Sequence, residues 1–192
     1  AVTANEIHIP IGKKLLFELR TADVIHDFWV AELSRKMDAI PEHPNLIWMQ
    51  ADRPGTYQGA CSEFCGAQHA WMRILVMAEP AEEFETWQKH QLESAQAPQG
   101  ASAQHGAQLF QQLTCVNCHA IKGPIAPVPP GPDLRHVGER KTLGAGVVLN
   151  TPEGLARWIK NPQALKPGNL MPDMRLNNEQ VTSLASYLNQ LQ

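Results

Sequence analysis

The sequence predicts two domains of different secondary structure, a β-sandwich or barrel followed by an all-α domain. Apolar residues alternate in the first half, as at Leu15, Phe17 and Leu19, which is the pattern of a half-buried strand. Near the C-terminus they recur at helical spacing, as at Val181 and Leu184. A chain of 192 residues is long enough for two domains of about 100 residues each.

Turn residues and apolar patterns place the expected elements along the chain. In the first half we expect short strands separated by turns, over 7–9, 15–19, 45–49, 55–59 and 74–77. A helix with acidic residues in its first turns is expected over 82–93. Further helices are expected over 103–114, capped by Ser102, over 152–160 and over 177–190. The long loops between 114 and 152 require a cofactor to fill the core of so small a domain.

The stretch 94–102 separates the two halves. Its residues are small, polar and uncharged, as in flexible linkers, so we expect domains over 1–93 and 103–192. Residues 1–96 carry 14 acidic and 8 basic side chains, and residues 97–192 carry 5 and 8. The second half is only slightly basic and has no cluster of Lys and Arg interleaved with aromatic residues, which argues against nucleic-acid binding. The sequence has no signal peptide and no apolar run of membrane-spanning length.

A loop of twelve residues concentrates ligands for soft metals. Cys61, Cys65, His69 and Met72 offer two thiolates, an imidazole and a thioether, a set that favours copper over hard cations. Zinc sites rarely use Met, and they usually have a second Cys/His pair downstream that this sequence lacks. A single blue copper needs one Cys and two His, so two cysteines could instead bridge two coppers. The second imidazole must then come from outside the loop.

His26 is the candidate for that second imidazole. It lies in a strand-like apolar run, where a lone His is usually a buried, hydrogen-bonded side chain. Beside a loop that lacks one imidazole, a metal ligand is the better interpretation. A Cys61–Cys65 disulfide is the alternative for the loop, but it leaves His69 and Met72 unexplained.

The second strong motif is C-x-x-C-H, formed by Cys115, Cys118 and His119. It is typical of covalent haem attachment, in which the cysteines form thioethers and the His binds iron. A thioredoxin-like dithiol expects a βαβ context, and half of a zinc site would need further cysteines, whereas all four are in the two motifs. A Met would serve as the sixth iron ligand, and Met171 and Met174 are the candidates.

The first domain resembles the CuA domain of cytochrome c oxidase subunit II over about residues 5–93. The resemblance rests on the loop 61–72 and the segments Ala22 to Val30 and Lys36 to Pro41. It implies a cupredoxin-like Greek-key sandwich or barrel that holds a dinuclear copper centre. The implied ligands are the bridging Cys61 and Cys65, one imidazole per copper from His26 and His69, and the weak ligands Met72 and the backbone carbonyl of Glu63. The Glu63 side chain resembles the family's carboxylate that meets a magnesium ion at the boundary with subunit I.

Residues 103–192 resemble class I cytochromes c, which have an all-α fold around haem c. The family's Pro-Gly-x-x-Met pattern falls on Met171 as the axial ligand. The resemblance also implies that the Pro132 carbonyl accepts a hydrogen bond from the axial His119 and that Arg140 reaches a haem propionate. Trp158 is a further candidate for a propionate bond, with a buried helix aromatic as the alternative.

A CuA domain followed by a cytochrome c domain resembles subunit II of a caa(3)-type oxidase. The resemblance implies that haem c takes electrons from a soluble cytochrome or a quinol-oxidising complex and passes them to CuA. CuA would then feed haem a of subunit I, where oxygen is reduced, so this chain alone is an electron carrier. Because the family anchors this subunit by two transmembrane helices, we expect a truncated soluble fragment. It would belong to the periplasmic side of a bacterial inner membrane.

Three other interpretations remain for the same residues. A CuA–cytochrome unit could serve a denitrification reductase rather than an oxidase, and the Lys36 to Asp38 segment argues against it by analogy alone. A copper-binding assembly or storage module would bind copper weakly without forming a stable dinuclear centre. A zinc site in the first domain predicts that this domain is colourless.

Overall fold

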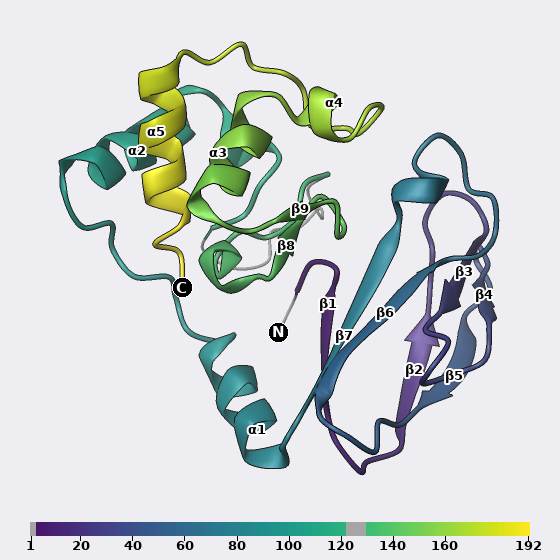
Figure 1. Cartoon of the computed structure of the whole chain (residues 1–192). Helices are drawn as coiled ribbons and strands as arrows, with labels where there is room; N and C mark the ends of the chain where they lie inside the picture. Colours follow the sequence, from purple (N-terminus) through teal and green to yellow (C-terminus); the bar gives the residue numbers. More distant parts are fainter. Residues whose placement is uncertain (1–2, 122–129) are drawn as a thin grey trace. The chain divides into compact units, whose positions relative to one another are not determined.

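The computed structural model describes residues 3–121 and 130–192. The chain divides into two compact units, Asn5–His90 and Gln91–Gln192, and the second unit also includes the residues before Asn5 (Figure 1). The first unit is built mostly of strands and the second mostly of helices, which confirms the predicted fold class. The domain limits at 93 and 103 that the linker suggested remain a prediction. Within the described residues, no helix combines the length and apolar character needed to cross a bilayer.

Seven strands and a helix form the unit Asn5–His90. They are β1 (Glu6–Pro10), β2 (Leu15–Leu19), β3 (His26–Trp29), β4 (Met37–Ala39), β5 (Asn45–Met49), β6 (Gly55–Cys61), β7 (Arg73–Glu79) and α1 (Ala81–His90), with a short 3-10 turn η1 (His69–Trp71). The larger sheet has the order β1-β7-β6-β3-β4, and β2 pairs with β5 in a second sheet. The pair β1 and β7 is parallel, while the other pairs are antiparallel.

The core of this unit takes side chains from both sheets. Ile9 and Val76 of the larger sheet and Met49 of β5 are each at most 1% exposed. Leu15 and Phe17 of β2 pack against the same cluster, as the alternation in the sequence predicts. Burying alternate residues of both sheets fixes the register of each strand, because a shift by one residue would turn its apolar side chains to water. The ends of β3 and β6 are thereby held in place.

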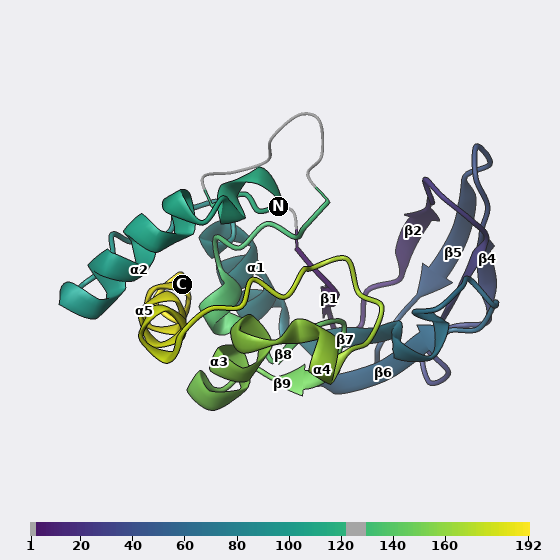
Figure 2. The same cartoon turned by 90° about the horizontal axis from the view of Figure 1, so that it is seen from above.

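The unit Gln91–Gln192 is helical, with long loops. Its elements are α2 (Ala101–Gln112), α3 (Pro152–Lys160), α4 (Pro162–Leu165), α5 (Asn178–Leu188), the short strands β8 (Thr142–Leu143) and β9 (Val148–Leu149), and the 3-10 turns η2 (Cys115–Asn117) and η3 (Val137–Glu139). The helices α2 and α5 lie side by side in both views (Figures 1 and 2). At their contact the Cα of Gly106 approaches the Ser183 backbone so closely that an added Cβ would lie 2.0 Å from the Ser183 carbonyl oxygen.

Helix ends follow the sequence signals, with two exceptions. Thr151 caps α3 by accepting a hydrogen bond from the Gly154 N–H, and Asn177 with Gln180 forms a capping box at α5. The predicted Ser102 cap is wrong, because α2 already begins at Ala101 with Gly100 at the cap position. The helix expected over 82–93 ends at His90.

Candidate functional site

The loop 61–72 is a closed connection between two antiparallel strands. β6 ends at Cys61 and β7 begins at Arg73, and the Cys61 N–H donates to the Met72 carbonyl at 3.0 Å across the base of the loop. β3 pairs with β6 so that Phe28 faces Cys61, which brings His26 to the same end of the sheet. The strand register therefore joins a residue early in the chain to the Cys-rich loop.

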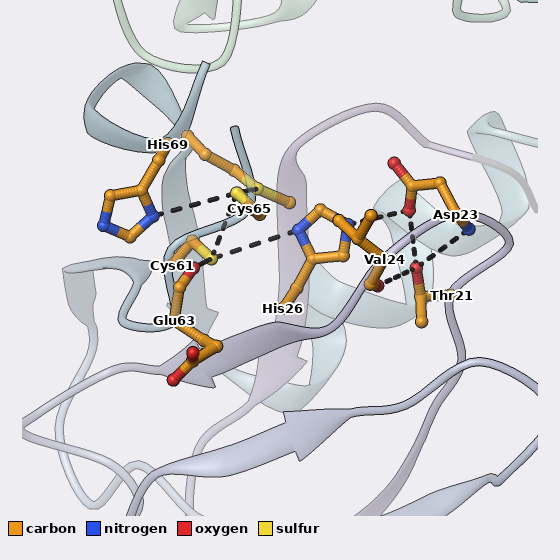
Figure 3. A network of polar contacts seen from close by, with 9 residues as sticks. Thr21, Asp23, Val24, His26, Cys61, Glu63, Cys65 and His69 are labelled. Atoms are coloured by element: carbon orange, nitrogen blue, oxygen red, sulfur yellow. Dashed lines mark hydrogen bonds and ion pairs between the residues drawn. The ribbon is translucent and has the colours of Figure 1, made fainter. Parts of the chain in front are cut away.

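Sulfur and nitrogen atoms converge at this end of the sheet (Figure 3). Cys61 Sγ lies 3.7 Å from Cys65 Sγ and 4.0 Å from His26 Nδ1. Cys65 Sγ in turn lies 3.7 Å from His69 Nδ1 and 4.0 Å from Met72 Sδ. Each sulfur thus faces the other sulfur and one imidazole nitrogen, so the arrangement consists of two similar halves.

Both cysteines are free, and their separation excludes a disulfide in this structure. A disulfide holds its sulfurs about 2.05 Å apart, well below the 3.7 Å between Cys61 and Cys65. Burial raises the pKa of the Cys65 thiol, and the neighbouring Cys61 raises it further. A cation bound between two such thiols would favour their ionised form. The cluster therefore has the chemistry of a metal site.

The distances also fit residues that share metal ions. A sulfur and a nitrogen bound to one ion at about 2.3 and about 2.0 Å lie roughly 3.5–4 Å apart. The two Sγ–Nδ1 distances, 3.7 and 4.0 Å, fall in this range. His26, Cys61 and Cys65 bring their ligand atoms within 4.8 Å of one another. The donor set of thiolates, imidazoles and a thioether fits copper.

A carboxylate orients the ring of His26. Its Nε2 lies 2.8 Å from Asp23 Oδ1, and this hydrogen bond, followed by one from Thr21, holds the pKa of Asp23 well below its usual range (Figure 3). With the proton on Nε2, the lone pair of Nδ1 points toward Cys61. His69 instead lies against the ring of Phe64, which is 77% exposed, with 5.7 Å between ring centroids. The surroundings of the two imidazoles therefore differ.

The backbone carbonyl and the side chain of Glu63 point in different directions. Its carbonyl oxygen lies 3.1 Å from Cys61 Sγ, whereas its carboxylate points away from the sulfurs (Figure 3). Close to it along the sheet, Asp27 of β3 is 6% exposed and faces Asp38 of β4. Burial raises the pKa of Asp27, and the charges of Asp38 and Glu63 raise it further. Glu63 therefore borders an acidic region beside the sulfur cluster.

The C-x-x-C-H segment is attached to the segment 131–134 by three hydrogen bonds. The Gly131 N–H donates to the Cys118 carbonyl at 2.9 Å, and the Leu134 N–H donates to the Ala120 carbonyl at 2.7 Å. Between them, His119 Nδ1 lies 2.9 Å from the Pro132 carbonyl oxygen. This bond requires a proton on Nδ1 and leaves the lone pair of Nε2 for a metal.

Gly131 allows the His119 ring to lie this close. A Cβ at Gly131 would be 2.6 Å from His119 Cε1 and 2.7 Å from His119 Nδ1. Burial lowers the pKa of His119, the Pro132 bond opposes that shift, and the Arg140 charge adds to it. A neutral imidazole with one free nitrogen, next to two free cysteines, fits a covalently attached haem.

The loop that carries Met171 is pinned to α4. Gln163 donates from Nε2 to the carbonyls of Asn169 and Met171, each at 2.8 Å, and accepts from the Gly168 N–H. Asn169 accepts from the Met171 N–H at 2.9 Å. Met171 is partly buried, whereas Met174 is 40% exposed and lies beyond the pinned part. The sequence offered Gln163 and Asn169 only as ordinary polar residues, so their part in this loop was missed.

Arg140 and Trp158 have different neighbours in the second unit. Arg140 Nη2 donates to the Asp133 carbonyl, one residue after Pro132. The Trp158 ring lies over Gly144, where a Cβ would be 2.7 Å from two ring carbons, and packs against the core cluster.

Asp23, which bonds His26, was also missed by the sequence reasoning, although an acidic residue three positions before a candidate ligand was a usable signal.

Comparisons with known proteins match both units. A family model described as "Cytochrome C oxidase subunit II, periplasmic domain" matches residues 2–79, and one described as "Cytochrome c" matches residues 103–192. Cytochrome c oxidase subunit 2 of Alkalihalophilus pseudofirmus is 37% identical over 97% of this chain and 54% of its own length. The protein of the same name from Bacillus sp. (strain PS3) is 31% identical over 97% of this chain and 55% of its own length. The chain thus spans about half the length of the curated relatives it matches.

A search of solved structures matches the periplasmic domain of subunit II of cytochrome oxidase of Bradyrhizobium japonicum. The match has 38% sequence identity and a TM-score of 0.42, and it covers 44% of this chain and 61% of that chain.

Proposed function

We propose that this chain is the electron-transfer part of a haem–copper terminal oxidase, because family models of the periplasmic domain of cytochrome c oxidase subunit II and of cytochrome c match its two units. These two matches imply copper in the first unit and haem in the second. The family model describes a periplasmic domain, which indicates an extracytoplasmic location. The observation that carries the proposal is the cluster of two sulfurs, each facing one imidazole nitrogen.

Cys61 and Cys65 are the proposed bridges of a dinuclear copper centre, CuA. His26 serves the half beside Cys61, and His69 serves the half beside Cys65. Met72 and the Glu63 carbonyl are the proposed weak ligands, supported by their distances of 4.0 and 3.1 Å to the nearer sulfur. A dinuclear copper centre supplies one-electron transfer with little change in geometry. The strands and the closed loop keep these ligands in fixed positions through that transfer.

Covalent haem c is the proposed cofactor of the second unit. Cys115 and Cys118 would attach it, His119 would bind iron through Nε2, and Met171 would supply the other protein ligand of the iron. The Pro132 carbonyl orients the imidazole of His119, which is supported by the 2.9 Å contact to Nδ1. Arg140 and Trp158 remain proposed contacts of the propionates.

Electrons would enter at the haem from a donor cytochrome or a quinol-oxidising complex and leave by way of the copper centre. The proposed acceptor is haem a in subunit I, on the outer face of a bacterial inner membrane. The Glu63 carboxylate would contact a magnesium ion at the boundary with that subunit, which is supported by its direction away from the sulfurs (Figure 3). Because no oxygen-reducing site is proposed within this chain, catalysis belongs to the whole oxidase.

Electron paramagnetic resonance of the copper-loaded, oxidised protein tests the proposal, with copper and haem quantified on the same sample. We expect two coppers per haem and a hyperfine pattern from one electron shared equally by two copper nuclei. Cys65→Ser should abolish the shared pattern while leaving the haem spectrum intact. The control is His43→Ala, which removes an exposed histidine that is not one of the clustered ligand residues and should leave both signals unchanged. A single-copper pattern in the unmodified protein would rule out the dinuclear centre.

A further inference from the structure

Lys166 is a buried cation. The residue is 8% exposed, and its ammonium donates to the Gly144 carbonyl at 2.9 Å. Among the residues that the structure describes, no carboxylate pairs with it. Burial lowers the pKa of Lys166, with no charged neighbour contributing. One neutral acceptor leaves two ammonium N–H groups for further partners.

Such a charge is normally compensated. Burying an ammonium without an ionic partner is strongly unfavourable, and buried charges in proteins are therefore paired or bound to ligands. Lysines at the surface of this unit do not need such a partner. Lys160, for example, is exposed and donates to the Leu176 carbonyl. The burial of Lys166 therefore points to an anion that the bound form of this unit supplies.

The position of Lys166 indicates which anion it meets. It begins the pinned loop that ends at Met171, the proposed iron ligand. Its acceptor, Gly144, is also the residue over which the Trp158 ring lies. Lys166 and Trp158 thus meet at one point of the loop between β8 and β9. Haem is the cofactor implied here, and its only anionic groups are two propionate carboxylates.

We propose that Lys166 is the counter-ion of a haem propionate in the second unit. This role rests on the proposed attachment of haem c at Cys115 and Cys118. Lys166 and Arg140 lie on different loops, so the two cations would compensate carboxylates at separate points. Lys166 is a positioning and charge-compensating residue, and it contributes no bond to iron.

The test compares Lys166→Gln with Lys166→Arg in the holoprotein. Gln keeps an N–H donor for the Gly144 carbonyl and removes the charge, whereas Arg keeps the charge. The midpoint potential of the haem is measured at pH 7, and covalent haem is quantified by its pyridine haemochrome spectrum. Removing one positive charge beside the propionates should favour the oxidised haem by about tenfold. The Arg variant should stay close to the unmodified protein, and so should the control Lys160→Gln.

A second measurement needs no substitution. In the reduced, diamagnetic holoprotein, nuclear Overhauser contacts should join the Lys166 side chain to the propionate methylene protons. An unchanged potential in Lys166→Gln together with no such contact would overturn the role of Lys166. Equal shifts in Lys166→Gln and Lys160→Gln would overturn it too, because they would reflect surface charge in general. Absence of covalent haem in the unmodified protein would instead refute the proposed function, which separates the two failures.

Discussion

Two imidazoles in this protein are each oriented by one hydrogen-bond partner. His26 is oriented by Asp23, three residues before it, and His119 by Pro132, thirteen residues after it. In both cases one ring nitrogen is used by the protein, which leaves the other nitrogen for a metal. The tautomer of each imidazole is therefore set before any metal binds.

Removing the carboxylate of Asp23 should weaken copper binding. Asp23→Ala leaves His26 free to rotate and to change tautomer, and loss of such a partner typically lowers metal affinity by about 10–100-fold. The measurement is a competition titration of copper against a chelator of known affinity. Asp52→Ala is the matched control, because Asp52 is also exposed and accepts a hydrogen bond from Gln50 rather than from a proposed ligand. Equal affinities for the two variants would refute this role.

The choice between Met171 and Met174 is also decided at one residue. Met171→Ala should remove the low-spin Met-ligated haem spectrum, whereas Met174→Ala should retain it. The reason is that the Met171 carbonyl accepts a hydrogen bond from Gln163 and its N–H donates to Asn169, which fixes the loop at Met171, while Met174 is 40% exposed. Absorption and magnetic circular dichroism near the Met–iron charge-transfer band provide the measurement. The reverse result would assign the ligand to Met174.

At the scale of elements, the sequence predicted the longer strands and helices because their apolar periods are regular, whereas the short elements β4, β8, β9 and α4 were not predicted. The strand expected over 45–49 and the helix over 152–160 agree with β5 and α3 to the residue. The prediction placed helix α2 two residues too late, because Ser102 has the chemistry of a cap. The residue at the cap position is instead Gly100, whose φ is +82°. Such backbone choices depend on what the helix packs against. The partners of buried groups, such as Lys166 with Gly144, depend on contacts between loops and leave no local pattern.

The contact between α2 and α5 depends on the absence of a side chain at Gly106. Gly106→Ala should destabilise the helical unit by about 1–3 kcal/mol, because the new methyl group meets the Ser183 backbone and the helices must separate. The intrinsic helix propensity of Ala, worth up to about 1 kcal/mol over Gly, acts in the opposite direction and is smaller. Chemical denaturation followed by the haem absorption measures the change. Gln111→Ala, at an exposed position of the same helix, is the control and should change stability little.

At the scale of the whole molecule, the chain consists of two units with separate cores, so each should respond to its own cofactor. A ligand that binds only the folded form stabilises the unit that holds it, by about 2.7 kcal/mol at a free concentration of about 100 times Kd. Added copper should therefore raise the unfolding temperature of the unit Asn5–His90 and leave the haem-containing unit unchanged. Calorimetry resolves the two transitions, and the Soret absorbance identifies the one that belongs to the helical unit. Cys65→Ser provides the control, because it should cancel the shift without moving the haem transition. A single transition, or one copper-dependent shift shared by both units, would mean that the two cores unfold as one and would contradict the division of the chain into independent units.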